Sequence, residues 1–185
     1  MNTTSTTKPI STHAACAKAI RTDLKAAFPH TKFSIRAEAF AGGDAVRIAW
    51  QDGPTAEEVR TITGRYECGH FDGMIDLYLH DNVDRSIPQV KYVQERREYS
   101  YAAIVAATEA LNARYGWRLR VSPSGAVEAD QASGLMTDWK AWKQNEPRWV
   151  LEHNSLICPT CQTPINLGQS ECPACDQALP PLVFR

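Results

Sequence analysis

The sequence predicts an α+β fold in which a mostly antiparallel sheet carries helices on one face. Several short segments between residues 32 and 121 alternate apolar and polar side chains with the two-residue period of half-buried strands. Other segments show the apolar spacing of amphipathic helices. The predicted strands come in hairpin-like pairs with helices interposed, which is typical of α+β proteins. A chain of 185 residues suffices for one sizeable domain and a small appendage.

The first half of the chain predicts two helices and two strands. One helix begins after Ser11 or Thr12, either of which can cap it, and ends before Pro29. The stretches "KFSIRA" and "AGGDAVRIAW" predict two strands joined by a glycine turn. "DGPT" breaks the second strand, and Thr55 with Glu58 forms a capping box at the head of a short helix.

The second half predicts further strands around one long helix. Within "YECGHFDGMIDLYLHD", the residues Ile75, Leu77 and Leu79 alternate with polar ones and predict a strand. We expect this strand to pair with the extended stretch "IPQVKYVQERREYS". Ser100 can cap the helix "YAAIVAATEALNARY", which Gly116 stops. "WRLRV" predicts a last clear strand, and a turn at "SPSG" leads into a short extended piece.

The stretch "DQASGLMTDWKAWKQNEPRWVLEHN" carries three tryptophans and separates this region from the cysteines that follow. It predicts an amphipathic helix that begins at Thr137 or Asp138 and stops before Pro147. The chain therefore divides into four predicted parts. These are a flexible leader (1–10), an α+β domain (11–135), a Trp-rich helical joint (136–150) and a cysteine tail (151–185).

The compartment follows from what the sequence lacks. Its apolar runs fall short of the roughly 18 residues that a membrane helix needs. The opening "MNTTSTTKPIST" does not have the charged-then-apolar layout of a secretory signal. We therefore expect a cytoplasmic protein without a membrane partner, whose six cysteines are reduced. Paired cysteines in that setting indicate metal before disulfide.

The tail contains two C-P-x-C pairs separated by ten residues. Each pair places two thiolates on one tight turn, and four thiolates suit a tetrahedral ion. The candidate ligands are Cys158, Cys161, Cys172 and Cys175. We predict one structural Zn²⁺, with iron as the alternative for the same ligands. Such a short segment cannot bury enough apolar surface to fold alone, and metal binding contributes on the order of 10 kcal/mol.

The predicted fold therefore includes a small C-terminal zinc ribbon. Four cysteine ligands leave no coordination position for a water molecule, so we expect no catalysis at this metal. No Lys or Arg lies between Leu151 and Phe184, which argues against a tail that grips phosphate. The ribbon is expected to fold the tail and to offer a protein-contact surface through "ALPPLVF".

Basic residues form a second candidate site, distributed over the predicted strands. If the apolar strand faces point to the helices, basic side chains gather on the opposite face of the sheet. Arginines there could bind phosphates and stack on exposed bases, although an ordinary solvated face is the alternative interpretation. The candidate nucleic-acid-binding residues are Lys32, Arg36, Arg47, Arg96, Arg97, Arg118 and Arg120.

A polar cluster in "CGHFDGMIDLYLHD" offers a third candidate site. His and Asp are metal ligands and general bases, so a hydrolase or a second metal site is one hypothesis. The other is a structural turn at "FDGM" followed by a solvated strand face, and no recognised catalytic spacing favours the first. The residues concerned are His70, Asp72, Asp76 and His80.

Residues 12 to about 100 resemble the large polyvalent protein-associated domains of conjugative plasmids and phages. The resemblance rests on "KAIR" with the following "LK" and "FP", on "KFS", on "W.DGPT" and on "FDGM.DLY". It implies a protein that travels with invading DNA and protects it or counters host defences. It implies no catalytic residues, and the cysteine tail lies outside it.

Together these patterns predict a non-enzymatic, zinc-binding accessory protein of a mobile genetic element. We expect it to bind nucleic acid or a host nucleic-acid-processing complex, and so to counter host defence in the manner of anti-restriction or anti-CRISPR factors. One alternative is a metal-assisted nuclease or hydrolase that uses the polar cluster. Another is a structural adaptor that docks a partner through the ribbon. No small-molecule substrate is expected.

Overall fold

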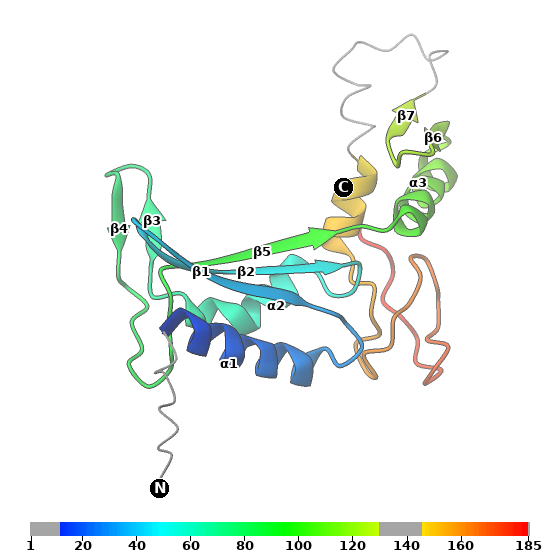
Figure 1. The fold of residues 1–185 in the computed structure, drawn as a ribbon. Coiled ribbons are helices and arrows are strands. Elements are labelled where there is room, and N and C mark those ends of the chain that lie inside the picture. The colour runs from blue at the N-terminus through cyan, green and yellow to red at the C-terminus, as the bar shows by residue number, and fades with distance from the viewer. Residues whose placement is uncertain (1–11, 130–145, 185) are drawn as a thin grey trace, which may run out of the picture. The chain divides into compact units, whose positions relative to one another are not determined.

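The structure is a computed structural model, and it describes residues 12–129 and 146–184. It has a mixed α+β architecture (Figure 1), as predicted. Its elements in chain order are α1 (Thr12–Ala27), β1 (Ser34–Phe40), β2 (Gly43–Gln51), α2 (Ala56–Thr63), the 3₁₀ helix η1 (Gly64–Tyr66), β3 (His70–Asp72), β4 (Leu77–Leu79), β5 (Tyr92–Glu98), α3 (Tyr101–Tyr115), β6 (Leu119–Val121) and β7 (Val127–Ala129). Residues 146–153 are also helical.

The chain forms two compact units. The first consists of the described residues of Met1–Ala27 together with Phe33–Ala49 and Arg60–Arg96. The second consists of Phe28–Lys32, Trp50–Val59 and the described residues of Arg97–Arg185. The cysteine tail thus shares a unit with α3. The predicted boundaries between an α+β domain, a joint and a ribbon stay a prediction.

A three-stranded sheet has the order β1-β2-β5. β1 and β2 pair antiparallel, and α1 and α2 lie on one face of the sheet (Figure 1). The stripe of α1 is buried at Cys16, Ile20 and Leu24. Val46 and Ile48 of β2 are buried as well, while Arg47 between them is exposed. The two-residue period therefore separates an apolar face under the helix from a polar face open to solvent.

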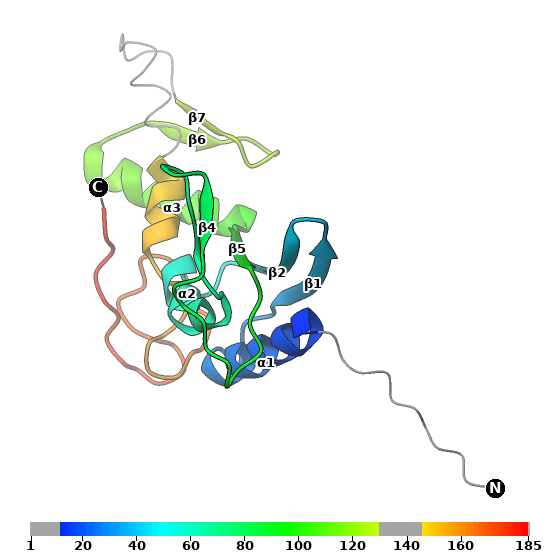
Figure 2. The same cartoon turned by 90° about the vertical axis from the view of Figure 1, so that its left-hand side faces the viewer.

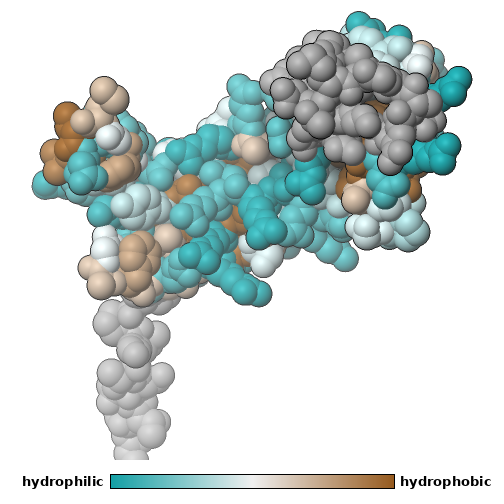
Figure 3. Space-filling view, turned by 90° about the horizontal axis from the view of Figure 1, so that it is seen from above, coloured by the Kyte–Doolittle hydropathy of each residue, from teal (hydrophilic) through white to brown (hydrophobic). Residues whose placement is uncertain are grey.

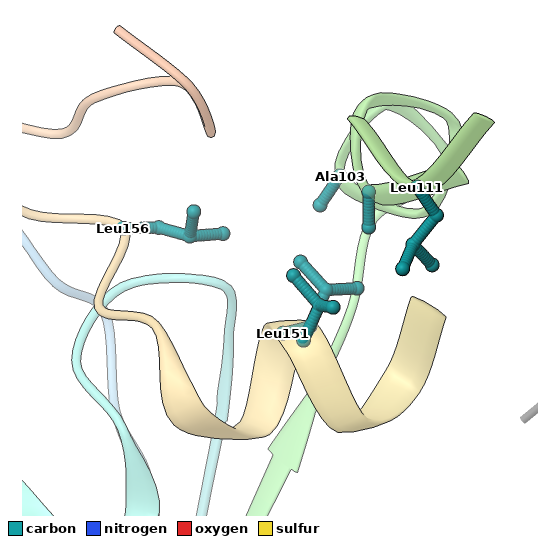
Figure 4. Close-up of a cluster of buried hydrophobic side chains, with 6 residues drawn as sticks. Ala103, Leu111, Leu151 and Leu156 are labelled. Atoms are coloured by element: carbon teal, nitrogen blue, oxygen red, sulfur yellow. The ribbon is translucent and has the colours of Figure 1, made fainter. Parts of the chain in front are cut away.

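The second unit has its own hydrophobic core (Figure 4). Buried side chains from α3 meet buried side chains from the helix over 146–153 and from the chain that follows it. The cluster consists of Ala103, Ala107, Leu111, Val150, Leu151 and Leu156. Leu167 and Phe184 of the tail are partly buried and pack against the same cluster. The tail is therefore stabilised by apolar packing in addition to its cysteines.

The predicted helix caps of α2 and α3 are present. The backbone N–H of Thr55 donates to Glu58 Oε2 over 2.6 Å, and the N–H of Glu58 donates to Thr55 Oγ1 over 3.2 Å. These two bonds are the reciprocal pair of a capping box. Ser100 Oγ accepts from the N–H of Ala103 at the start of α3. Gly116 ends that helix with a φ of 65°, in the left-handed region that suits glycine.

The predicted pairing of the strand at Ile75–His80 is wrong. The observed strand is only β4, and it pairs antiparallel with β3, whereas β5 joins the three-stranded sheet. Asp76 has a φ of 52°, and Asp72 Oδ1 accepts from the N–H of Met74, so residues before Leu77 form the turn of a short hairpin. The alternation of apolar and polar residues continues through this turn, so the sequence pattern did not reveal it.

The helix over 146–153 was not predicted. Pro147 lies within its described part, so the predicted helix stop before Pro147 is wrong. The predicted helix start at Thr137 or Asp138, and most of the predicted joint, lie outside the described residues. Across 12–129 and 146–184, no helix is both long and apolar enough to cross a membrane.

The guanidinium of Arg97 connects three segments of the second unit. Its Nε donates to the carbonyl oxygen of Asp52 over 2.9 Å, and its Nη2 donates to that of Gly53 over 2.8 Å. Nη1 donates to the carbonyl of Leu151, and both Nη atoms lie 3.3 Å from that of Asn154. Burial lowers the pKa of Arg97, but the surrounding oxygens satisfy its donors.

We expect Arg97→Lys to destabilise the protein by about 3 kcal/mol, because a lysine ammonium cannot reach these four carbonyls and leaves some of them unsatisfied. Urea unfolding of the full chain measures the change. Arg118→Lys, at an exposed position of the same unit, is the control and should stay within about 0.5 kcal/mol of the parent. Equal stability of the two variants would contradict the role given to Arg97.

Candidate functional site

The four tail cysteines come together at one point. All four Sγ atoms lie within 4.8 Å of one another. The Sγ atoms of Cys158 and Cys175 are 3.7 Å apart, and those of Cys161 and Cys172 are 3.6 Å apart. Four sulfurs at about 2.3 Å from one tetrahedral ion are roughly 3.8 Å apart. The cluster therefore has the size and the donor set of a metal centre.

Two backbone turns of the same design position these sulfurs. In the first, the N–H of Cys158 donates to the carbonyl of Thr163, and the N–H of Gln162 donates back to the carbonyl of Cys158, each over 2.9 Å. The second turn repeats both bonds at the same offsets with Cys172, Asp176 and Gln177. Gln162 and Asp176, which follow the second cysteine of each pair, have φ values of 59° and 55°.

The left-handed residue reverses the chain directly after each pair, so both thiols of a turn face the same side. The backbone bonds join residues within each turn, so each turn brings its own two thiols together. This arrangement fits the expectation that two C-x-x-C turns provide the four ligands of one ion.

The environment of the thiols also suits a cation. Hydrogen bonds with the side chain and backbone of Thr163 lower the pKa of Cys161 to about 6, so this thiol readily forms the thiolate that a metal needs. A backbone hydrogen bond at Gln177 lowers the pKa of Cys175, but burial and the neighbouring cysteines outweigh it and raise the pKa to about 12. Four thiolates at these distances repel one another, and a bound cation removes that repulsion.

Three of the seven candidate basic residues share one site in the first unit. Arg36 of β1 lies directly opposite Arg47 of β2 in the strand register. Both line a groove of about 420 Å³ together with Arg96 of β5. The groove lies on the face of the sheet away from α1, and Figure 3 shows this side of the molecule as mostly hydrophilic. An exposed sheet face with three neighbouring arginines is thus present.

Arg47 has an acidic partner beside the groove. Arg47 Nη2 lies 2.8 Å from Glu38 Oε1, and the side chain of Arg47 is 62% exposed. An ion pair at such an exposed position contributes little to stability, about 0–1 kcal/mol. Its main effect is to hold a carboxylate beside the groove.

Two aromatic side chains lie on the same face and were missed by the sequence prediction. Phe40 follows Arg36 by four positions and Tyr92 precedes Arg96 by four, so the two-residue period of a strand puts each aromatic on its arginine's side. Their rings are stacked with centroids 6.2 Å apart, and Phe40 is 48% exposed. The same spacing could have revealed them from the sequence.

The other four basic residues lie elsewhere. Lys32 belongs to the second unit, and so does Arg97, whose guanidinium is occupied by backbone carbonyls. Arg118 precedes β6 and Arg120 lies on it, in a separate two-stranded sheet with β7. Arg120 is opposite Glu128 in that sheet. The prediction grouped these residues on the assumption that their strands are adjacent, which the sequence does not reveal.

The polar cluster is spread over the β3–β4 hairpin. His70 Nδ1 lies 3.0 Å from Asp81 Oδ2, and Asp72 closes the turn at Met74. Asp76 is a turn residue with positive φ, and His80 Nδ1 lies 3.5 Å from the Sγ of Cys68. Within the residues that the structure describes, the four tail cysteines are the only group of three or more Cys, His, Asp or Glu residues placed to hold a metal ion.

The predicted contact segment "ALPPLVF" has internal partners in the second unit. Val183 exchanges two backbone hydrogen bonds with the side chain of Asn154, over 2.8 and 2.9 Å. Phe184 packs against the hydrophobic cluster of α3. Part of this segment therefore serves the fold of its own unit.

Residues 11–100 match the family described as large polyvalent protein associated domain 29. This match confirms the resemblance that the sequence motifs indicated. It spans α1 to β5, and therefore includes the arginine groove, but it leaves out α3 and the cysteine tail. The match supports an association with mobile genetic elements. Comparisons with curated proteins and with solved structures found no match.

We expect Cys172→Ala to remove the bound metal, because three remaining thiolates cannot complete the tetrahedral set. The purified variant should contain less than about a tenth of the parent's metal by elemental analysis. Amide exchange over residues 157–178 should accelerate, since the backbone bonds of both turns lose their anchor. Cys68→Ala, outside the cluster, is the control and should retain the metal. Retention of metal in Cys172→Ala would show that this cluster is not its binding site.

Proposed function

We propose that this chain is a non-enzymatic, zinc-binding accessory protein of a mobile genetic element that binds single-stranded nucleic acid on the open face of β1-β2-β5. The observation that supports it best is the groove shared by Arg36, Arg47 and Arg96, with Phe40 and Tyr92 on the same face. Residues on three adjacent strands thus combine cationic and aromatic side chains.

Each part of this surface suits one part of a nucleic acid. Guanidinium groups bind phosphate oxygens through two parallel hydrogen bonds and remain charged at all physiological pH values. Neighbouring strands are about 4.8 Å apart, so Arg36 and Arg47 can contact the same phosphate or its neighbour. An exposed aromatic ring provides a stacking surface for a base.

Unpaired strands fit this surface better than a duplex does. Stacking on Phe40 requires a base that is free of its own stack, as in single strands, loops and ends. Among the described elements of the first unit, α1 lies on the opposite side of the sheet (Figure 1), so it does not offer a helix on this face that could enter a major groove. We therefore infer a preference for single-stranded DNA or RNA, read mainly through backbone charge and stacking.

The metal site has a structural role in this proposal. Four cysteine sulfurs favour zinc, and they leave no open coordination position for a substrate. The tail has no Lys or Arg between Leu151 and Phe184, so it does not add to phosphate binding. Zinc instead stabilises the turns that bring Leu167 and Phe184 onto the core of the second unit.

The biological role that we infer is protection of the element's nucleic acid from host defence. A match to a domain of large polyvalent proteins supports the context of a mobile element. A protein that covers single strands would shield the intermediates that host nucleases and guide complexes attack. The target could equally be the nucleic-acid component of a host complex, because backbone charge and stacking carry little sequence specificity.

We expect Arg36→Ala, Arg47→Ala and Arg96→Ala each to weaken binding of a labelled 12-nucleotide single strand by about 5- to 10-fold at 50 mM salt. Each should also reduce the slope of log K against log salt by about 0.7, since one phosphate contact is lost. Fluorescence anisotropy over a salt series measures both. Arg118→Ala and Arg120→Ala are matched controls in the other unit and should leave affinity and slope unchanged.

We expect Phe40→Ala to weaken the same binding by about 10-fold without a change in the salt slope, because stacking contributes about 1–3 kcal/mol per base and releases no counterions. Anisotropy with the same oligonucleotide tests this difference. Phe40→Tyr keeps the ring and should bind like the parent. A normal affinity in Phe40→Ala would limit the site to its arginines, and normal affinity in all four variants would refute the proposed surface.

A further inference from the structure

The β3–β4 hairpin exposes large apolar side chains that form no part of either candidate site. Met74 is 94% exposed, Ile75 59% and Leu77 54%. Phe71, on the other strand, is 52% exposed. In Figure 3 a group of hydrophobic residues gathers at the left, where Figure 1 places β3 and β4. Four such side chains within seven residues are more than the scattered apolar residues of an ordinary surface.

Contacts with the rest of the first unit hold this hairpin in place. A pair of three-residue strands is not stable by itself, so it needs contacts from the rest of the unit. The hydroxyl of Tyr78 donates to the carbonyl of Lys91, and its ring meets that of Tyr92 at a centroid distance of 5.4 Å. Burial raises the pKa of Tyr78 above its ordinary range, so the hydroxyl keeps the proton that it donates.

The backbone at the base of the hairpin is also tightly packed. A Cβ added at Gly69 would lie 1.8 Å from the carbonyl oxygen of Leu79, so only glycine permits this approach. The N–H of Cys68 donates to the carbonyl of Val90 over 2.9 Å. Figure 1 shows β3 and β4 as an upright hairpin, and Figure 2 shows the same hairpin turned by 90°. The apolar tip is thus presented in a fixed shape, which reduces the entropy that binding would lose.

The charges around the tip define the partner. Residues 67–84 contain five acids and no Lys or Arg. Glu67 is paired with Arg60, and Asp81, at the base of the hairpin, lies beside His70. Asp72 and Asp76 flank Met74 and Ile75 in the turn of the hairpin. Such a rim repels nucleic acid, anionic lipid and a second copy of the same hairpin, and it attracts a surface rich in Lys and Arg.

We propose that the β3–β4 hairpin is a docking site for a protein partner that has an apolar cleft with a basic rim. Met74 and Ile75 enter the cleft, and the surrounding aspartates pair with the rim. This surface is distinct from the arginine groove, so it adds a protein contact to the proposed nucleic-acid binding. It does not depend on that proposal, because none of the four exposed apolar residues lines the groove.

A model peptide of defined chemistry tests the inference on the full chain. The probe is a 16-residue amphipathic helix with leucine on one face and lysine on the other. A second peptide keeps the leucines and replaces each lysine by glutamate. Methyl NMR of ¹³C-methionine protein reports directly on Met74, and titration gives the affinity.

We expect the lysine peptide to shift the Met74 methyl signal and the glutamate peptide to leave it unchanged. Met74→Ser with Ile75→Ser should weaken binding at least about 10-fold, and higher salt should weaken it further. Val183→Ser removes a side chain of similar exposure (51%) in the other unit and should bind like the parent. The hairpin variant should bind single strands normally, so this test is separate from that of the arginine groove.

Three results would overturn the inference. One is a Met74 signal that does not respond to the lysine peptide. Another is equal binding by the parent and the Met74→Ser, Ile75→Ser variant, which would place the peptide elsewhere. The third is a dimer of the parent in sedimentation that this variant abolishes, which would make a second copy of the chain the occupant.

Discussion

The guanidinium of Arg97 binds backbone carbonyls of the turn that follows β2 and of the chain that leads into the cysteine tail. A planar group with five donors is the one side chain that can serve several carbonyls in a partly buried position. Arg97, Asp52 and Gly53 lie within the family match, whereas Leu151 and Asn154 lie outside it. Arg97, near the end of the matched region, therefore binds and stabilises a segment that lies outside the family match.

The tail has two independent supports beyond this anchor. Its turns are closed by backbone hydrogen bonds around the cysteine cluster, and Leu167 and Phe184 pack on the core that α3 provides. A metal-stapled segment of this size gains little from apolar burial when it stands alone. Here it shares a core with a 15-residue helix. The cysteine turns and the apolar packing thus act on the same unit, which explains how so short a tail can keep a defined conformation.

Local signals predicted the parts of the fold that local interactions determine. The capping box at Thr55, the left-handed Gly116 and both cysteine turns follow from residue type and spacing alone. The strand pairing in this region was predicted wrongly because strands of three residues depend on contacts such as the one between Tyr78 and Lys91. The arginines were assigned to one surface because alternation gives the face of a strand but not the sheet that it joins.

Glu38 gives the arginine groove a property that charge alone would not. Its carboxylate contacts Arg47 Nη2, so an anion that binds this end of the guanidinium has to compete with a tethered carboxylate. A single small anion such as chloride or acetate gains little by that exchange, since it replaces one contact with another. A polyanion that engages several guanidinium groups at once loses the same one contact but gains the others. In the proposed nucleic-acid binding, the resident carboxylate would therefore favour ligands with repeated charges over single small anions.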